Sequence, residues 1–350
     1  MPAVRQALFA PTERPGYSQL RLPLAEVKET ILQHPEFQTF NQAAKQIFND
    51  WQQAHLAELQ QIDHSTQPKE LIEQLSESLL ARFKNSPLLN AYDIYQQLMD
   101  YWAASMQDDC YLISADGWQQ GAKPREQIKS KNANNKLEWP KEPFDYTQGK
   151  RRFKSELIPA QLLIDRYLME EQDNLTLAKG MLADIEQQLQ ELLEEHGSED
   201  GLLAEVVEGE GDKQKVTAKA IKAQLNTLGM SADDAQERSL LKQCEKLLNL
   251  QSRAKTVVKD TTELLNEAIA ERYPKLSQAD IQTLVIHDKW MAALSAAEHS
   301  ELDRVSQTLT SRIRELAERY ATPLPQLVDE VEALAAKVDG HLKKMGAVWN

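Results

Sequence analysis

The chain has 350 residues, 41% of them hydrophobic, which is enough for two or three domains with a substantial core. A formal net charge of −14 argues against a surface that binds nucleic acid over its whole extent, because clustered Lys and Arg drive binding to phosphates. The only cysteines, Cys110 and Cys244, exclude a disulfide framework and a thiolate zinc site, and no apolar run is long enough to cross a membrane.

The composition indicates helix and a reducing, cytoplasmic location, since Leu, Ala, Glu, Gln and Lys dominate while Gly and Pro are few. The predicted fold class is mainly α with minor β: an N-terminal helical domain, an antiparallel coiled-coil hairpin with a small tip, and C-terminal helices. The predicted boundaries are 1–120 for the helical globular domain, 121–156 for a basic irregular linker, 157–272 for the hairpin with its tip at about 200–230, and 273–350 for the C-terminal helical segment.

Four helices are predicted between residues 23 and 106, each opened by Pro or a polar cap and each carrying an apolar stripe. The clearest stripe consists of Phe37, Phe40, Ala44, Ile47 and Trp51. Helical patterning then stops at Asp108 and Asp109, and residues 110–114 (CYLIS) predict a short strand. Residues 119–150 predict a long loop.

The predicted loop overlaps a basic stretch, residues 121–154, which holds ten Lys or Arg against four acidic residues. The rest of the chain is correspondingly about −20. Trp118 and Trp139 lie in or beside this stretch and are candidates for stacking on bases. A solvated loop and a nucleic-acid contact both remain open for it.

Residues 157–195 show a heptad-like pattern that predicts a long helix with a pairing seam. The seam residues are Leu168, Leu175, Leu182, Ile185, Leu189 and Leu192. Residues 240–272 repeat apolar positions at alternating spacings of four and three and supply a partner. An antiparallel hairpin within the chain is the economical arrangement.

The predicted tip contains a turn at residues 209–212 (GEGD), possible strands beside it, and a helix capped by Thr217. After the hairpin, Ser277 is expected to cap another helix. Two further apolar stripes follow. They are Leu302, Val305, Leu309, Ile313 and Leu316, and then Leu327, Val331, Leu334, Val338 and Met345.

No motif in the chain predicts a catalytic, cofactor-binding or metal-binding residue. A Gly-rich strand-to-helix turn for a nucleotide or adenosyl group is missing, and no histidines fall at ligand spacing. Asp108, Asp109 and Asp116 could hold a hard cation, although carboxylates at a helix end are the commoner reading. Cys110 and Cys244 are interpreted as packing residues.

Several runs together resemble the C-terminal part of the modification (M) subunit of type I restriction-modification systems, in a long-tailed subgroup. The runs are residues 4–12 (VRQALFAPT), 14–18 (RPGYS), 91–102 (AYDIYQQLMDYW), 106–109 (MQDD), 111–113 (YLI), 115–118 (ADGW), 288–290 (DKW) and 312–320 (RIRELAERY). The resemblance implies an adenine-specific DNA methyltransferase that uses S-adenosylmethionine and works with a specificity subunit and a restriction subunit.

The chain departs from that family because it lacks both the Gly-rich cofactor loop and any Asn-Pro dipeptide. Those motifs lie upstream in full-length members, so the resemblance implies a truncated or excised tail that is inactive by itself. The implied role is docking to the specificity subunit through the coiled-coil and C-terminal helices, and helping to bind DNA. Candidate phosphate contacts are Lys150, Arg151, Arg152 and Lys154. The alternative is a free-standing coiled-coil interaction scaffold unrelated to DNA modification.

Overall fold

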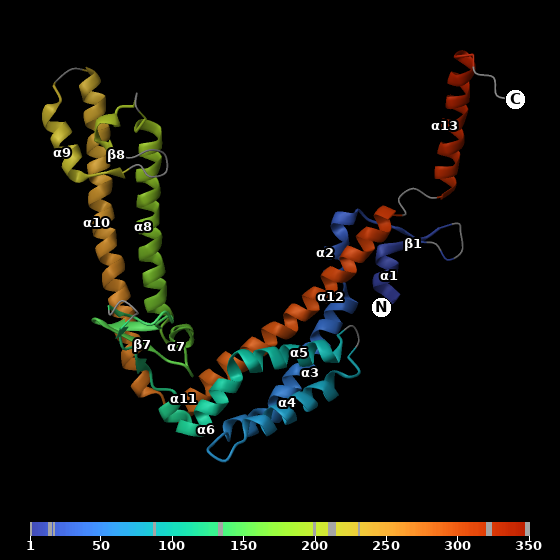
Figure 1. Cartoon of the computed structure of the whole chain (residues 1–350), viewed down its shortest axis with the longest axis horizontal. Coiled ribbons are helices and arrows are strands. Elements are labelled where there is room, and N and C mark those ends of the chain that lie inside the picture. Colours follow the sequence, from blue (N-terminus) through green and yellow to red (C-terminus); the bar gives the residue numbers. More distant parts are fainter. Residues whose placement is uncertain are drawn as a thin grey trace. The chain divides into compact units, whose positions relative to one another are not determined.

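The computed structural model describes residues 2–12, 16, 18–86, 89–131, 136–198, 201–208, 215–229, 232–319 and 324–346. It is mainly α with short strands, which confirms the predicted fold class (Figure 1). The α-helices are α1 (Pro2–Leu8), α2 (Val27–Gln33), α3 (Pro35–Gln60), α4 (Pro68–Phe83), α5 (Ala91–Tyr101), α6 (Gln107–Gly121), α7 (Ala160–Tyr167), α8 (Met169–His196), α9 (Ala218–Thr227), α10 (Ala232–Arg272), α11 (Gln278–Gln282), α12 (Ala292–Arg319) and α13 (Leu324–Lys344).

Short helical turns and strands complete the chain. The 3-10 turns are η1 (Leu24–Glu26), η3 (Ala204–Val206) and η5 (Tyr273–Lys275), and the π-helical segments are η2 (Trp102–Met106) and η6 (Thr283–Met291). The strands are β1 (Phe9–Pro11), β2 (Ser18–Leu20), β3 (Arg125–Glu126), β4 (Ser130–Lys131), β5 (Leu137–Glu138), β6 (Tyr146–Gln148), β7 (Arg151–Lys154), β8 (Val207–Glu208) and β9 (Lys215–Val216).

The chain divides into two compact units. The first comprises Met1–Ser114 with Trp290–Asn350, and the second comprises Ala115–Lys289. The first unit therefore joins the N-terminal helices to α12, and the second takes in the residues predicted as the linker and as the hairpin.

In the first unit, α2 to α5 are the four helices that the apolar stripes predicted. On α3 the side chains of Phe37, Phe40, Ala44 and Trp51 are buried, and that of Ile47 is half-buried. α4 packs against both α3 and α5. The indole Nε1 of Trp51 donates a hydrogen bond to the Leu75 carbonyl oxygen at 3.2 Å, so the indole is buried with its donor satisfied.

The N-terminal helix α1 packs against α2 and α3. This contact has its own apolar cluster, to which the far end of α12 contributes one residue. The buried members are Val4, Leu8, Val27, Ile31, Phe37 and Ile313. Within the predicted α12 stripe, Leu302 and Ile313 are buried and Val305 is half-buried, whereas Leu309 and Leu316 are exposed.

Two interpretations of residues 107–121 are wrong. The chain is helical from η2 through α6, so the helix does not stop at Asp109. Residues 110–114 form no strand. Met106, Cys110 and Ile113 are all buried at helical spacing, and packing of such a stripe outweighs the β propensity of a short run. The helix bends at Gly117, whose φ of 76° is one that residues with a Cβ rarely adopt.

A buried hydrogen bond links α6 to η6 within the first unit. Trp290 Nε1 donates to Asp109 Oδ2 at 2.8 Å, and both side chains are buried. A carboxylate acceptor makes this bond stronger than one between neutral groups. The bond also supplies a partner for a carboxylate that would be costly to bury alone.

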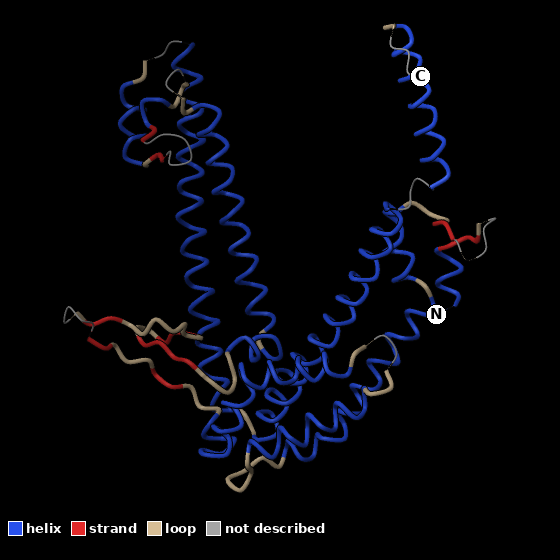
Figure 2. The backbone as a smooth tube through the Cα atoms, turned by 45° about the vertical axis from the view of Figure 1, so that its right-hand side comes forward, coloured by secondary structure: helices blue, strands red, loops and turns tan. Residues whose placement is uncertain are grey.

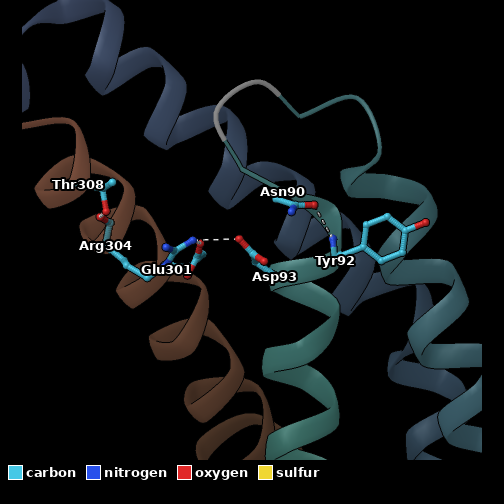
Figure 3. Close-up of polar contacts among 6 residues, drawn as sticks. All are labelled: Asn90, Tyr92, Asp93, Glu301, Arg304 and Thr308. Carbon is cyan, nitrogen blue, oxygen red and sulfur yellow. Dashed lines mark hydrogen bonds and ion pairs between the residues drawn. The ribbon is translucent and has the colours of Figure 1, made fainter. Parts of the chain in front are cut away.

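Arg304 joins α12 to α5 (Figure 3). Its guanidinium donates to Asp93 Oδ2 at 2.9 Å and to the two carboxylate oxygens of Glu301 at 2.6 and 2.7 Å. Glu301 is buried, so Arg304 provides the opposite charge that a buried carboxylate requires. On α5, the Asn90 side chain caps the helix by accepting a hydrogen bond from Tyr92 N at 3.0 Å.

In the second unit, α8 and α10 lie side by side and antiparallel, as predicted (Figures 1 and 2). Gln251 Nε2 donates to Glu186 Oε1 at 3.0 Å, and Lys255 Nζ lies 3.3 Å from the same oxygen. On α10, Cys244 and Leu247 face inwards and are buried. Burial raises the pKa of the Cys244 thiol to about 11.

The six predicted seam residues contribute unequally to this pairing. Leu175, Leu189 and Leu192 are buried on α8, and Leu182 and Ile185 are half-buried. Leu168 is buried too, but it lies at the break between α7 and α8 with φ −129° and ψ 32°. The helix predicted to be continuous over residues 157–195 is therefore two helices.

The tip of the hairpin has a small core of its own. Its buried members are Leu189, Leu192, Leu193, Leu203, Val206, Val216, Ile221, Leu241, Cys244 and Leu247. β8 pairs antiparallel with β9, and the Thr217 hydroxyl accepts from Ala220 N at 3.2 Å, which confirms the predicted strands and cap. The turn predicted at residues 209–212 lies outside the described residues.

Beyond the hairpin, Ser277 begins α11 with a complete capping box. Its side chain accepts from Asp280 N, and the Asp280 carboxylate accepts from Ser277 N at 2.9 Å. The predicted cap at Ser277 is confirmed.

The carboxyl group of Glu298 on α12 is buried without a matched partner. Its side chain is only 2% exposed, and among the described residues Oε1 has no hydrogen-bond donor. Burial raises the pKa of Glu298 above its ordinary value of 4.5, and the positive charge of Lys45 opposes that shift only in part. A neutral side chain would suit this position better at neutral pH.

Glu298→Gln is expected to increase the free energy of unfolding at neutral pH by on the order of 1 kcal/mol, because it removes a buried charge. A carboxyl whose folded-state pKa is raised stabilises the fold fully below the unfolded value of 4.5, and this contribution is lost as the pH rises through the folded pKa. The gain should therefore shrink near pH 4.5. Urea denaturation at both pH values checks this, with Glu318→Gln on the exposed side of α12 as the control. An equal gain in both variants would contradict it.

Candidate nucleic-acid interface

The basic stretch folds into a small β structure, here called the β-lobe, formed by residues 125–131 and 136–154. β7 lies between β3 and β6 in a three-stranded antiparallel sheet, and β4 pairs with β5 in a separate ladder (Figure 2). The long loop predicted for residues 119–150 is therefore wrong where these strands form. They are two to four residues long, too short for a clear alternating pattern in the sequence.

Aromatic stacking holds the β-lobe against the base of the hairpin. The ring of Tyr146 on β6 stacks on Phe153 of β7 at 5.1 Å between centroids and on Tyr273 at 5.7 Å. Asn266 of α10 donates to the Thr147 hydroxyl at 3.1 Å. The sheet is thus fixed to α10 by both apolar and polar contacts.

Tyr273 also connects the β-lobe to the segment that leads into α7. Its hydroxyl donates to the Ile158 carbonyl oxygen at 2.7 Å in a buried position. Burial raises the pKa of Tyr273 and that of Tyr146 above the ordinary value of 10.0, so both hydroxyls remain protonated. Tyr273 is thus a neutral, hydrogen-bonded contact that supports the cation-bearing strands of the β-lobe.

Arg152 lies within cation–π distance of two aromatic rings of the β-lobe. Its guanidinium carbon lies 4.7 Å from the ring centroid of Trp139 and 4.6 Å from that of Phe144. Two rings within cation–π distance hold a planar guanidinium in one orientation. The N–H groups at its edge are then the part suited to a bidentate contact with a phosphate.

The other three candidate cations differ in their surroundings. Arg151 lies 3.6 Å from a carboxylate oxygen of Glu126. Lys154 donates to Glu142 at 2.9 Å, and this hydrogen bond raises the pKa of Lys154. Both positive charges are partly offset by an acid. Lys150 is exposed and follows Gly149, whose φ of 59° forms the turn between β6 and β7.

The structure adds residues that the candidate set lacks. Lys129 Nζ lies 4.8 Å from the ring centroid of Trp139, and the Phe144 ring is 41% exposed beside Arg152. The alternation of cations with aromatic residues along the stretch is the sequence signal that could have indicated them. Trp118, a candidate for stacking on bases, is buried instead.

A second candidate surface is a groove between α8 and α10. It is lined by Glu171, Asn174, Leu177, Ala178, Met181, Val257, Thr261 and Leu264. Large apolar side chains that line it, such as Leu177 and Leu264, are more than half exposed. Apolar side chains gathered in a groove between two helices are suited to contact with a further amphipathic helix.

Within the part of the chain that the structure describes, no three His, Cys, Asp or Glu side chains gather as a metal site would require. The alternative reading of Asp108, Asp109 and Asp116 as a cation site therefore has no support there. Asp109 accepts the Trp290 hydrogen bond instead. Among the described helices, none is both long and apolar enough to span a membrane.

Comparisons with protein families, with curated proteins and with solved structures found no match to this chain.

Tyr273→Phe is expected to destabilise the second unit by about 1–2 kcal/mol, because it leaves the buried Ile158 carbonyl oxygen without its donor. Hydrogen exchange should rise in residues 146–158. The exposed Tyr92, replaced by Phe, is the control. If exchange in this segment stays at the parent rate, the hydroxyl does not hold the β-lobe.

Proposed function

We propose that this chain is the noncatalytic C-terminal portion of a type I restriction-modification DNA adenine methyltransferase M subunit, which docks to the specificity subunit and assists DNA binding. The β-lobe is the observation that carries the proposal, since it gathers cations and aromatic rings in one place on an otherwise acidic chain. The resemblance of the sequence supplies the identity of the assembly. S-adenosylmethionine belongs to the full-length family, not to this portion.

The β-lobe supports DNA binding through the geometry of Arg152. Its guanidinium lies over the rings of both Trp139 and Phe144, and its N–H groups suit a bidentate contact with a phosphate. Lys150 lies on the neighbouring turn, where an exposed ammonium adds a point charge. Such contacts position a DNA backbone without reading its sequence, which fits an assembly where the specificity subunit selects the target.

The apolar groove between α8 and α10 supports docking to the specificity subunit. Exposed Leu177, Met181 and Leu264 would lose contact with water when a partner helix fills the groove. Acidic Glu171 at the groove would meet a basic position of that helix. In this arrangement the restriction subunit and the DNA bind to the complete assembly that the M and specificity subunits form.

The competing function is a free-standing coiled-coil scaffold, and the same groove favours it. A scaffold would bind helices through α8 and α10 but would make no use of the cations of the β-lobe. DNA binding therefore separates the two functions.

Charge reversal by Arg152→Glu is expected to weaken binding to duplex DNA about tenfold, because it removes an oriented phosphate contact. Arg151→Glu should have a smaller effect, since Glu126 already offsets that charge. Fluorescence anisotropy with labelled duplex at low and moderate salt measures both, for the chain and for a reconstituted assembly.

Lys259→Glu is the matched control for this experiment, because Lys259 is exposed on α10 and lies outside the β-lobe. A folded Arg152→Glu variant with unchanged affinity at low salt would exclude the β-lobe as the DNA contact. An equal loss with Lys259→Glu would mean that only the net charge of the chain matters.

Docking through the groove predicts that Leu177→Asp combined with Leu264→Asp prevents co-purification with a co-expressed type I specificity subunit. Both side chains are exposed in the isolated chain, so the substitutions should leave its folding unchanged. Lys246→Asp, at an exposed position of α10 outside the groove, is the control. Retained co-purification of the double variant would rule out the groove.

A further inference from the structure

The C-terminal helix α13 carries an apolar stripe that its own chain does not cover. Every residue from 327 to 340 is exposed, and in the described part of the chain no other helix packs extensively against α13. The stripe residues are between 44% and 64% exposed. They are Leu327, Val328, Val331, Leu334 and Val338.

A helix of 21 residues with this much exposed apolar surface gains little stability in water by itself. The stripe has the spacing of a coiled-coil seam, with valines at one core position of the heptad (Val331 and Val338) and leucines at the other (Leu327 and Leu334).

The charges of α13 are unequal along its length. Its first half holds only acids, Asp329, Glu330 and Glu332, whereas its second half holds Lys337, Lys343 and Lys344 together with one acid, Asp339. Two parallel copies would bring like charges together at both ends. Two antiparallel copies can instead place Glu330 of each beside Lys337 of the other.

We propose that α13 pairs with α13 of a second copy of this chain as an antiparallel two-stranded coiled coil. When Val331 is placed opposite Leu334 of the second copy, each core layer brings a valine against a leucine. Val338 then meets the second copy's Leu327. The paired segment covers residues 327–338 in both copies, and His341 falls outside it.

The flanking positions agree with the same register. Glu330 lies beside Lys337 of the second copy, and by symmetry this ion pair occurs twice. On the other side of the seam Val328 lies beside the second copy's Ala335, which extends the apolar contact. Because the interface is two-fold, it closes on itself and makes a dimer, not a filament. Its small size predicts a weak, concentration-dependent dimer.

The inference does not rest on the proposed function and is tested with the full chain alone. Sedimentation velocity from low to high micromolar concentration should show a monomer–dimer equilibrium. Leu334→Asp should weaken dimerisation at least tenfold, whereas Ala336→Asp on the opposite side of α13 should leave it unchanged. Both positions are exposed in the monomer, so both variants should keep the parent fold, which the near-ultraviolet circular dichroism of the aromatic side chains outside α13 checks.

The charge pair tests the orientation. Glu330→Lys and Lys337→Glu should each weaken the dimer about three- to tenfold, and the double variant should restore parent affinity. A parallel pair would instead place both residues beside uncharged positions of the second copy, so the exchange would restore nothing. A monomer at all concentrations, an unaffected Leu334→Asp variant, or a double variant without restoration would each overturn the proposal. Capture of α13 by a specificity subunit with no dimer of the chain alone would overturn it too.

Discussion

The antiparallel pairing of α8 with α10 is the contact on which the second unit depends. The two helices enclose Leu175, Leu189 and Cys244, and their partnership gives the remaining parts of the unit a fixed support. At one end the tip packs α9 and the β8–β9 pair over the same apolar residues. At the other end Tyr273 and Asn266 hold the β-lobe. Without this pairing, strands of two to four residues would have no surface against which to fold.

Long helices were predicted well from the sequence because their stripes are repeated several times. The α3 stripe and the α8–α10 seam each run over many turns, so the signal accumulates. Residues 110–114 were too few to show a period, and their β-prone types suggested a strand although Cys110 and Ile113 continue a helical stripe. The break at Leu168 was missed for the opposite reason, since the heptad spacing passes through it while the backbone does not.

The candidate interface shows what a count of charges leaves out. The sequence placed ten cations in one stretch, and all but Lys123 lie in the β-lobe. It did not show that Glu126 and Glu142 are folded onto Arg151 and Lys154, because those pairs depend on strand register. Nor did it show that Arg152 lies over two aromatic rings or that Trp118 is buried. Each of these depends on contacts between residues that are apart in the sequence.

Cys244 gives the hairpin an internal reporter of its own opening. Alkylating reagents attack the thiolate, and a buried thiol with a pKa near 11 is almost entirely protonated at neutral pH. It is also sealed between α8, α9 and α10 in the core of the tip. Its chemical modification therefore requires the tip core around it to open. The rate of labelling at the Cys244 sulfur measures how often the tip core opens. A ligand that stabilises the closed hairpin would lower this rate.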